Sequence, residues 1–183
     1  MQRKIFIGVD LPNDVKKRLM QKVKKWEKLP IRWSREENIH LTLISLGYVS
    51  DDLIFDICEK VKMAVGEMDV FDIDLSRIEL GPTQEKDAKI VQFTGKISKE
   101  LKELSENIEK KLGIFQANKK EFKPHITLGR IQQYGWQKLK SIPNVAEEFS
   151  VLLPIESVQI FESAIIDGKR KFSVIDSELL SEW

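Results

Sequence analysis

Two tetrads give the strongest indication of the fold of this chain, His40-Leu41-Thr42-Leu43 and His125-Ile126-Thr127-Leu128. The chain contains only 2 histidines and threonine is rare in it, so a matching His-x-Thr-Leu around each histidine is not expected by chance. Each tetrad alternates polar and aliphatic residues, which is typical of a β-strand with one buried face. Because residues i and i+2 of a strand share a face, each histidine is predicted to lie beside its threonine.

The repeat extends beyond the tetrads. Phe6-Ile7-Gly8 precedes the first predicted helix, and Phe93-Thr94-Gly95 precedes its counterpart in the second half of the chain. The order strand, helix, strand therefore occurs twice, and nearly half of the chain separates the two histidines. We predict an internally duplicated α+β fold, in which residues 1–183 form a single domain of two pseudo-symmetric lobes that each carry one His-x-Thr motif.

Hydrophobic periodicity predicts the remaining elements. Alternating or β-branched runs indicate strands at Lys4–Val9, Ile39–Leu46, Phe71–Leu75, Ile90–Lys96, His125–Leu128, Phe149–Leu153, Ser157–Phe161 and Phe172–Ile175. Helical spacing indicates helices that begin at Pro12-Asn13, after Ser50 and after Ser98, and a weaker helix near Tyr134–Leu139. We expect Gly47 to end its strand, Leu53 to lie on the inner face of its helix, and lysine pairs such as Lys16-Lys17 to be solvated.

Composition limits the classes of protein to consider. The formal net charge is +1, which argues against an extended binder of duplex nucleic acid, so any contact with nucleic acid must come from a local patch. No apolar run is long enough to cross a membrane, and the start of the chain lacks a secretory leader, so we expect a cytoplasmic location. The single cysteine, Cys58, is interpreted as a small buried hydrophobic residue.

Together the tetrads offer a pair of imidazoles and a pair of hydroxyls, which the pseudo-twofold would gather between the lobes. This set suits an in-line displacement at phosphorus, in which one imidazole takes a proton from water and the other protonates a leaving ribose oxygen. An ordinary histidine pKa of about 6.5 allows both protonation states near neutral pH. We predict His40 and His125 as the acid–base pair, with Thr42 and Thr127 donating hydrogen bonds to the phosphate oxygens.

Arg130 is a further candidate phosphate ligand. Strict alternation would place it on the face opposite His125, so it reaches the phosphate only if the strand bulges or ends at Gly129. A catalytic zinc needs three protein ligands, which two histidines without a suitably spaced carboxylate do not supply. The chain also lacks a glycine-rich phosphate loop, so we expect neither a metal nor a bound cofactor.

The paired tetrads resemble those of the two-histidine phosphoesterase superfamily, and within it the RNA 2′,3′-cyclic phosphodiesterases, also called 2′-5′ RNA ligase-like proteins. The resemblance also includes Phe6-Ile7-Gly8-Val9, Leu11-Pro12, Arg32-Trp33, Asn38, Phe122-Lys123-Pro124, Arg130, Phe161-Glu162-Ser163 and Gly168. Phe172 is a departure, because the family often has tyrosine at that position.

The resemblance implies a bilobal fold of two antiparallel β-sheets that face a central cleft, with helices on the outside. It implies metal-independent hydrolysis of an RNA terminal 2′,3′-cyclic phosphodiester to a 2′-phosphomonoester. By the same resemblance, His40 is the proton donor to the leaving O3′ and His125 is the proton acceptor, roles that the symmetry of the sequence leaves open. We expect a monomer whose partner is an RNA 3′ end or a small nucleotide bearing a 2′,3′-cyclic phosphate.

Other hypotheses share the same residues. The substrate could be a nucleoside 2′,3′-cyclic phosphate or a cyclic phosphate on ADP-ribose, with Phe6 or Trp33 as stacking partners of a base. A nucleotide-binding module without catalysis is a second alternative, although such a module usually lacks one of the motif histidines. Formation of 2′-5′ bonds would be the reverse of transesterification at the same site.

Overall fold

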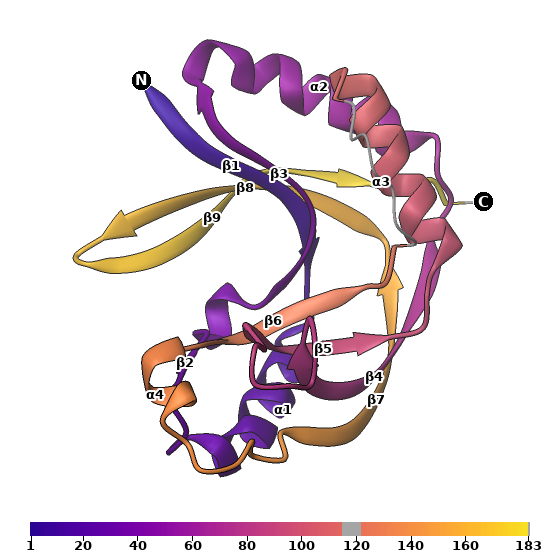
Figure 1. Ribbon diagram of the computed structural model, residues 1–183. Coiled ribbons are helices and arrows are strands. Elements are labelled where there is room, and N and C mark those ends of the chain that lie inside the picture. Colours follow the sequence, from indigo (N-terminus) through magenta and orange to yellow (C-terminus); the bar gives the residue numbers. More distant parts are fainter. Residues whose placement is uncertain (115–121, 183) are drawn as a thin grey trace.

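The protein folds into two antiparallel β-sheets with helices outside them, as seen in a computed structural model that describes residues 1–114 and 122–182 (Figure 1). The first sheet has the strand order β3-β1-β8-β9, and the second has the order β2-β6-β5-β4-β7. The strands are β1 (Gln2–Asp10), β2 (Ile31–Trp33), β3 (His40–Ser50), β4 (Phe71–Gly81), β5 (Ile90–Gly95), β6 (His125–Ile131), β7 (Ala146–Ile155), β8 (Ser157–Ile166) and β9 (Lys169–Leu179). The predicted α+β class with two antiparallel sheets is confirmed.

The repeat of strand, helix, strand is visible in the topology. Strand β1 leads through α1 (Asn13–Val23) to β3, and β5 leads through α3 (Lys99–Leu112) to β6. Each pair lies side by side in its own sheet, and β8-β9 extends the first sheet as β4-β7 extends the second. The sheets do not follow the halves of the sequence, because β2 and β4 come early in the chain but join the sheet of β5 and β6.

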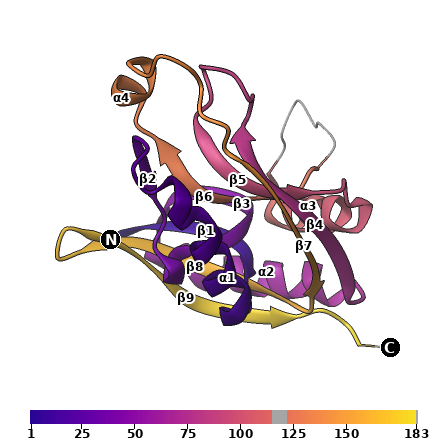
Figure 2. The ribbon, with the colours of Figure 1, turned by 90° about the horizontal axis from the view of Figure 1, so that it is seen from below.

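The helices cover the outer faces of the sheets. Helix α2 (Ile54–Gly66) contacts β8 and β9 and packs beside α3 (Figures 1 and 2). Helix α1 lies instead against the second sheet, where Arg18 lies over the ring of Phe149 and Lys22 forms an ion pair with Glu147 of β7 at 2.8 Å. Shorter helices complete the chain: η1 (Lys24–Trp26), η2 (Glu36–Asn38), η3 (Asp51–Leu53) and α4 (Gln133–Gln137).

The hydrophobic core lies between each sheet and its helices. The predicted alternation on β4 is present, because Ile73 and Leu75 are buried while Asp72 is exposed. Burial of one such aliphatic side chain stabilises the fold by about 1.5–3 kcal/mol. Cys58 belongs to this core, as predicted, and no helix of the described residues has the length and apolar character to span a membrane.

Most element predictions are confirmed, but some details are wrong. Ser98 caps α3 by accepting a hydrogen bond from the backbone N–H of Leu101 at 3.1 Å, as expected. Ser50 does not cap α2, which is preceded by the η3 turn, and Leu53 is exposed on that turn. Gly47 does not end β3, because its left-handed φ of 72° lets the strand continue past an irregularity in the ladder.

Lys16 is not solvated, although its neighbour Lys17 is exposed. Its side chain is buried, and its Nζ lies 2.7 Å from a carboxylate oxygen of Asp10 at the end of β1. The backbone N–H of Asp10 donates to the side-chain oxygen of Gln159 on β8 at 2.8 Å, which fixes this end of the strand. The ion pair therefore ties the first turn of α1 to the end of β1, although the body of the helix packs on the second sheet, and the periodicity of the helix does not reveal this contact.

Candidate active site between the two sheets

A cavity of about 730 Å³ is lined by both tetrads. His40 and Thr42 enter it from β3, and His125 and Thr127 enter it from β6. Strands β3 and β6 belong to different sheets but contact each other, so the two motifs share one space. This volume is within the range of about 300–1,000 Å³ that is usual for small-molecule sites.

Both strands bulge at the leucine that ends the tetrad. In β3, Thr42 pairs with Gly8 and Ile44 pairs with Ile7, so Leu43 has no partner on β1. In β6, Leu128 lacks a partner on β5 in the same way. In a regular strand, the residues two and four positions after the histidine would share its face. Each bulge reverses this alternation, so the residue that follows the threonine on the cavity face is five positions after the histidine rather than four.

The bulge on β6 brings Arg130 into the cavity with His125 and Thr127. The bulge required for this was expected at Gly129 and occurs one residue earlier, at Leu128. The residue of β3 that matches Arg130 is Ser45. It also lines the cavity, and it was not predicted from the sequence. The two histidine strands therefore differ at this position, with a cation on one and a hydroxyl on the other.

Two glycines leave room for close neighbours around the bulges, backbone at Gly8 and side chains at Gly129. A Cβ on Gly8 would lie 2.4 Å from the backbone oxygen of Leu41, in the first tetrad. A Cβ on Gly129 would lie 2.7 Å from a side-chain carbon of Ile31 and 2.9 Å from the ring of Trp33. A side chain at Gly8 would therefore displace the backbone of β3, and one at Gly129 would displace the side chains of Ile31 and Trp33.

His40 is held in one orientation by hydrogen bonds at both ring nitrogens. Its Nδ1 lies 2.8 Å from the backbone oxygen of Asn38, and its Nε2 lies 2.7 Å from the hydroxyl oxygen of Thr42. The carbonyl oxygen can only accept, so Nδ1 carries a proton and donates it. In the neutral ring Nε2 then accepts from Thr42, and in the charged ring it donates.

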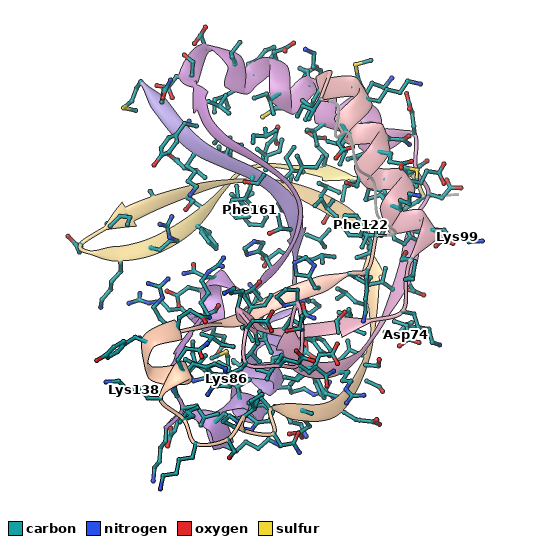
Figure 3. The ribbon with its side chains drawn as sticks, viewed as in Figure 1. Asp74, Lys86, Lys99, Phe122, Lys138 and Phe161 are labelled. Atoms are coloured by element: carbon teal, nitrogen blue, oxygen red, sulfur yellow. The ribbon has the colours of Figure 1, made fainter. Side chains whose placement is uncertain are left out.

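Aromatic rings surround the imidazole of His40. Its ring centroid lies 4.6 Å from that of Phe6, 5.7 Å from Phe161 and 5.1 Å from Phe172. Figure 3 shows Phe161 on the first sheet, and its ring stacks on Phe6. Burial lowers the pKa of His40 below 6.5, because the charged imidazole loses water, while the carbonyl of Asn38 acts in the opposite direction.

His125 has a different environment, because it is exposed at the start of β6. The backbone before it is fixed by Thr94, whose buried hydroxyl donates to the carbonyl oxygen of Pro124 at 2.8 Å. Thr94 is also the partner of His125 in the ladder between β5 and β6. The two histidines therefore face one cavity, with His40 packed among rings and His125 open to solvent.

Cations surround the cavity. Arg32 of β2 lies directly opposite Arg130 of β6 in the antiparallel ladder, an arrangement that costs energy unless an anion lies nearby. The other basic residues of the wall are Lys4, Arg35, Lys169 and Arg170. Aspartate and glutamate are absent from the wall among the described residues, so a chain with a net charge of +1 concentrates positive charge here.

The described residues of this site lack a cluster of typical metal ligands. Within residues 1–114 and 122–182, no three histidine, cysteine, aspartate or glutamate side chains gather closely enough to hold an ion. The side-chain donors that line the cavity are imidazoles, hydroxyls, guanidinium groups, ammonium groups, the amide of Asn38 and the indole of Trp33. Such a set fits an anionic ligand better than a cation.

Comparisons with known proteins agree with this arrangement. The model of the family described as LigT-like phosphoesterase matches residues 9–92, which include the first tetrad. A protein of Thermotoga maritima named RNA 2′,3′-cyclic phosphodiesterase is 31% identical over 73% of this chain and 74% of its own length. Among solved structures, TT0787 of Thermus thermophilus has a TM-score of 0.76 at 21% identity, covering 97% of both chains. E. coli LigT complexed with 3′-AMP has a TM-score of 0.74 at 20% identity, covering 100% of both chains.

Proposed function

Because this chain belongs to the LigT-like phosphoesterase family, we propose that it hydrolyses RNA terminal 2′,3′-cyclic phosphodiesters to 2′-phosphomonoesters by paired-histidine catalysis. Four curated relatives carry the name RNA 2′,3′-cyclic phosphodiesterase, and the chain is an enzyme of this kind. The observation that carries the finer proposal is the presence of His40 and His125 in the same cavity, on strands of different sheets.

The reaction is an in-line displacement at phosphorus. The oxygen of a water molecule attacks the phosphorus atom, His125 accepts a proton from that water, and the bond between phosphorus and O3′ breaks. His40 gives its proton to O3′, which leaves the phosphate on O2′. The assignment of His40 as proton donor and His125 as proton acceptor follows the family resemblance. The exposure of His125 supports its role as the base that takes a proton from water.

The protonation state of His40 depends on the substrate. Burial lowers its pKa in the free protein, which works against an acid that must be charged. A cyclic phosphate carries a negative charge, and an opposite charge within about 4–6 Å favours the charged imidazole. Binding of the substrate therefore charges the residue that will donate the proton.

Thr42, Thr127 and Arg130 are the proposed ligands of the non-bridging phosphate oxygens. All three line the cavity beside the histidines. Hydroxyl donors and a guanidinium group stabilise the charge that develops on these oxygens in the transition state. Arg32, opposite Arg130, adds a second guanidinium group to the same side of the cavity.

Hydrolysis of a short RNA that ends in a 2′,3′-cyclic phosphate tests the proposal. The assay compares the wild type with His40→Ala and His125→Ala in excess EDTA and determines which ribose oxygen carries the phosphate in the product. We expect a 2′-phosphate from the wild type and a loss of roughly 10²-fold or more in each variant. A product with a 3′-phosphate would contradict the assigned leaving group, and activity abolished by EDTA would contradict catalysis without a metal.

Hydrolysis of a nucleoside 2′,3′-cyclic phosphate is the second candidate function. It is favoured by the size of the cavity and by the structural similarity to E. coli LigT, which has been solved with 3′-AMP. The chemistry at the histidines would be the same. The same assay with adenosine 2′,3′-cyclic phosphate measures this activity, and the absence of turnover on both substrates by the folded wild type would favour a binding module.

A further inference from the structure

We infer that the sheet face formed by β1, β8 and β9 binds the nucleotide that precedes the cyclic end of an RNA, with Lys4 and Arg170 contacting the phosphate between the two nucleotides. This inference rests on the proposed function and specifies its substrate class. An oligonucleotide with at least one phosphodiester upstream of the cyclic end is then a better substrate than a mononucleotide.

The chemistry gives the direction in which the RNA leaves the site. The leaving O3′ belongs to the terminal ribose, so this ribose lies beside His40, which protonates O3′. The attacking water lies on the opposite side of the phosphorus atom, beside His125. The rest of the RNA therefore continues over the sheet that carries His40, which has the strand order β3-β1-β8-β9.

The registers of this sheet define what the RNA meets next. Phe6 and Lys4 share one face of β1, and Lys4 pairs with Ser163 of β8. Ser163 in turn pairs with Phe172 of β9, and Arg170 lies two residues before Phe172 on the same face. All of these side chains line the cavity. An RNA that extends from His40 over this face thus contacts aromatic rings first and then the two cations Lys4 and Arg170.

Arg170 is held in place before any ligand binds. Its Nη1 donates to the hydroxyl oxygen of Ser163 at 2.6 Å. Its backbone oxygen accepts a hydrogen bond from the side-chain amide of Asn38 at 3.0 Å, and the backbone oxygen of Asn38 accepts from His40. The hairpin of β8 and β9 is therefore tied to the histidine, although it extends away from the body of the protein in Figures 1 and 2.

No acidic residue neutralises these cations within the described part of the chain. Lys4 and Arg170 form no ion pair there, and the nearby Glu162 is bonded instead to Arg3 at 2.6 Å. Glu162 and Arg3 are each one residue away from the cavity-facing positions, so they lie on the other face of their strands. A phosphodiester offers the negative charge and the acceptor oxygens that this pair of cations lacks.

The test compares kcat/KM for a dinucleotide, ApA ending in a 2′,3′-cyclic phosphate, with that for adenosine 2′,3′-cyclic phosphate. The variants Lys4→Met and Arg170→Met remove charge while keeping an apolar side chain. We expect the ratio of the two kcat/KM values to fall roughly tenfold in each variant, the size of one charge-assisted hydrogen bond. Lys171→Met is the matched control, because Lys171 is exposed on the other face of β9, and its ratio should equal that of the wild type.

A dinucleotide with an uncharged methylphosphonate linkage identifies the contact. With this substrate, Lys4→Met and Arg170→Met should no longer differ from the wild type, because the charge that they contact is gone. A ratio that is unchanged in both variants would overturn the inference. So would a ratio that falls only in Arg32→Met, on β2 of the second sheet. Turnover of neither substrate by the wild type would instead overturn the proposed function, so the two failures are distinguishable.

Discussion

The hydroxyl oxygen of Thr42 lies 2.7 Å from Nε2 of His40. The other ring nitrogen, Nδ1, is already hydrogen-bonded to the backbone oxygen of Asn38. In the proposed mechanism, Thr42 therefore touches the imidazole atom that exchanges a proton with the substrate. The same hydroxyl can rotate to a phosphate oxygen once a ligand enters, because a hydroxyl is both a donor and an acceptor. We therefore expect Thr42 to orient the proposed acid before binding and to contact the phosphate after binding.

Thr42→Val should lower kcat/KM for a cyclic phosphate by roughly tenfold, since it removes one hydrogen bond to a charged group. Thr42→Ser keeps the hydroxyl and should retain most of the activity. Steady-state kinetics on adenosine 2′,3′-cyclic phosphate measure both, and Thr127→Val provides the comparison on the other strand. Full activity of Thr42→Val would exclude this role of the hydroxyl.

Phe172→Ala should raise the pKa of His40 towards 6.5. Burial is the largest cause of the lowered pKa, and removal of the ring 5.1 Å from the imidazole admits water to it. NMR titration of the histidine ring signals measures the change in pKa. The chain has 2 histidines, so the signals that remain in His125→Gln belong to His40. Val174→Ala, at an exposed position of the same strand, is the control. A pKa that stays the same or falls in Phe172→Ala would contradict the packing explanation.

Stability should decrease at acidic pH because of His40. Its folded pKa is lowered, so the unfolded chain binds a proton more readily once the pH falls below about 6.5. The contribution is therefore fully present above pH 6.5 and is lost as the pH falls through the folded pKa. His40→Gln removes this titration, and its unfolding free energy in urea should decline less from pH 7.5 to pH 5 than that of the wild type. Equal declines would show that His40 does not carry the effect.

Gly8→Ala should destabilise the protein by about 1–3 kcal/mol, the usual cost of overpacking. Its Cβ would lie 2.4 Å from the backbone oxygen of Leu41, which cannot move without displacing the strand of His40. Urea denaturation measures the loss, and activity should fall with it. Gly66→Ala is the matched control, because a Cβ there has no neighbour within 4 Å. Gly66→Ala should be neutral or stabilising by up to about 1 kcal/mol.

Local patterns in the sequence were sufficient to predict the histidine strands. Alternation around His40 and His125 identified β3 and β6, and the repeated tetrads indicated that they meet. Strand β2 was missed because Ile31–Trp33 is too short to show a period, and it forms only by pairing with β6. Because β2 was not predicted, the position of Arg32 opposite Arg130 was not predicted either.

Features that depend on distant partners could not be read from the sequence. The bulge on β6 was placed one residue late, because its position depends on the register with β5. Lys16 is buried only because the helix that carries it meets Asp10 at the end of β1. Lys4 and Arg170 are far apart in the chain, and they come together only through the pairing of β1 with β8 and of β8 with β9.

The matching bulges also affect how a substrate is oriented. Two nearly equivalent strands, each with a histidine and a threonine, would accept a cyclic phosphate in either of two opposite poses, with acid and base exchanged. Arg130 on one strand and Ser45 on the other make these poses unequal in energy, because only β6 offers a guanidinium group at this position. A difference of about 1.4 kcal/mol is enough for a tenfold preference. In the proposed mechanism, the fifth residue after each histidine thus adds a preferred direction to a site whose two motifs are nearly identical in sequence.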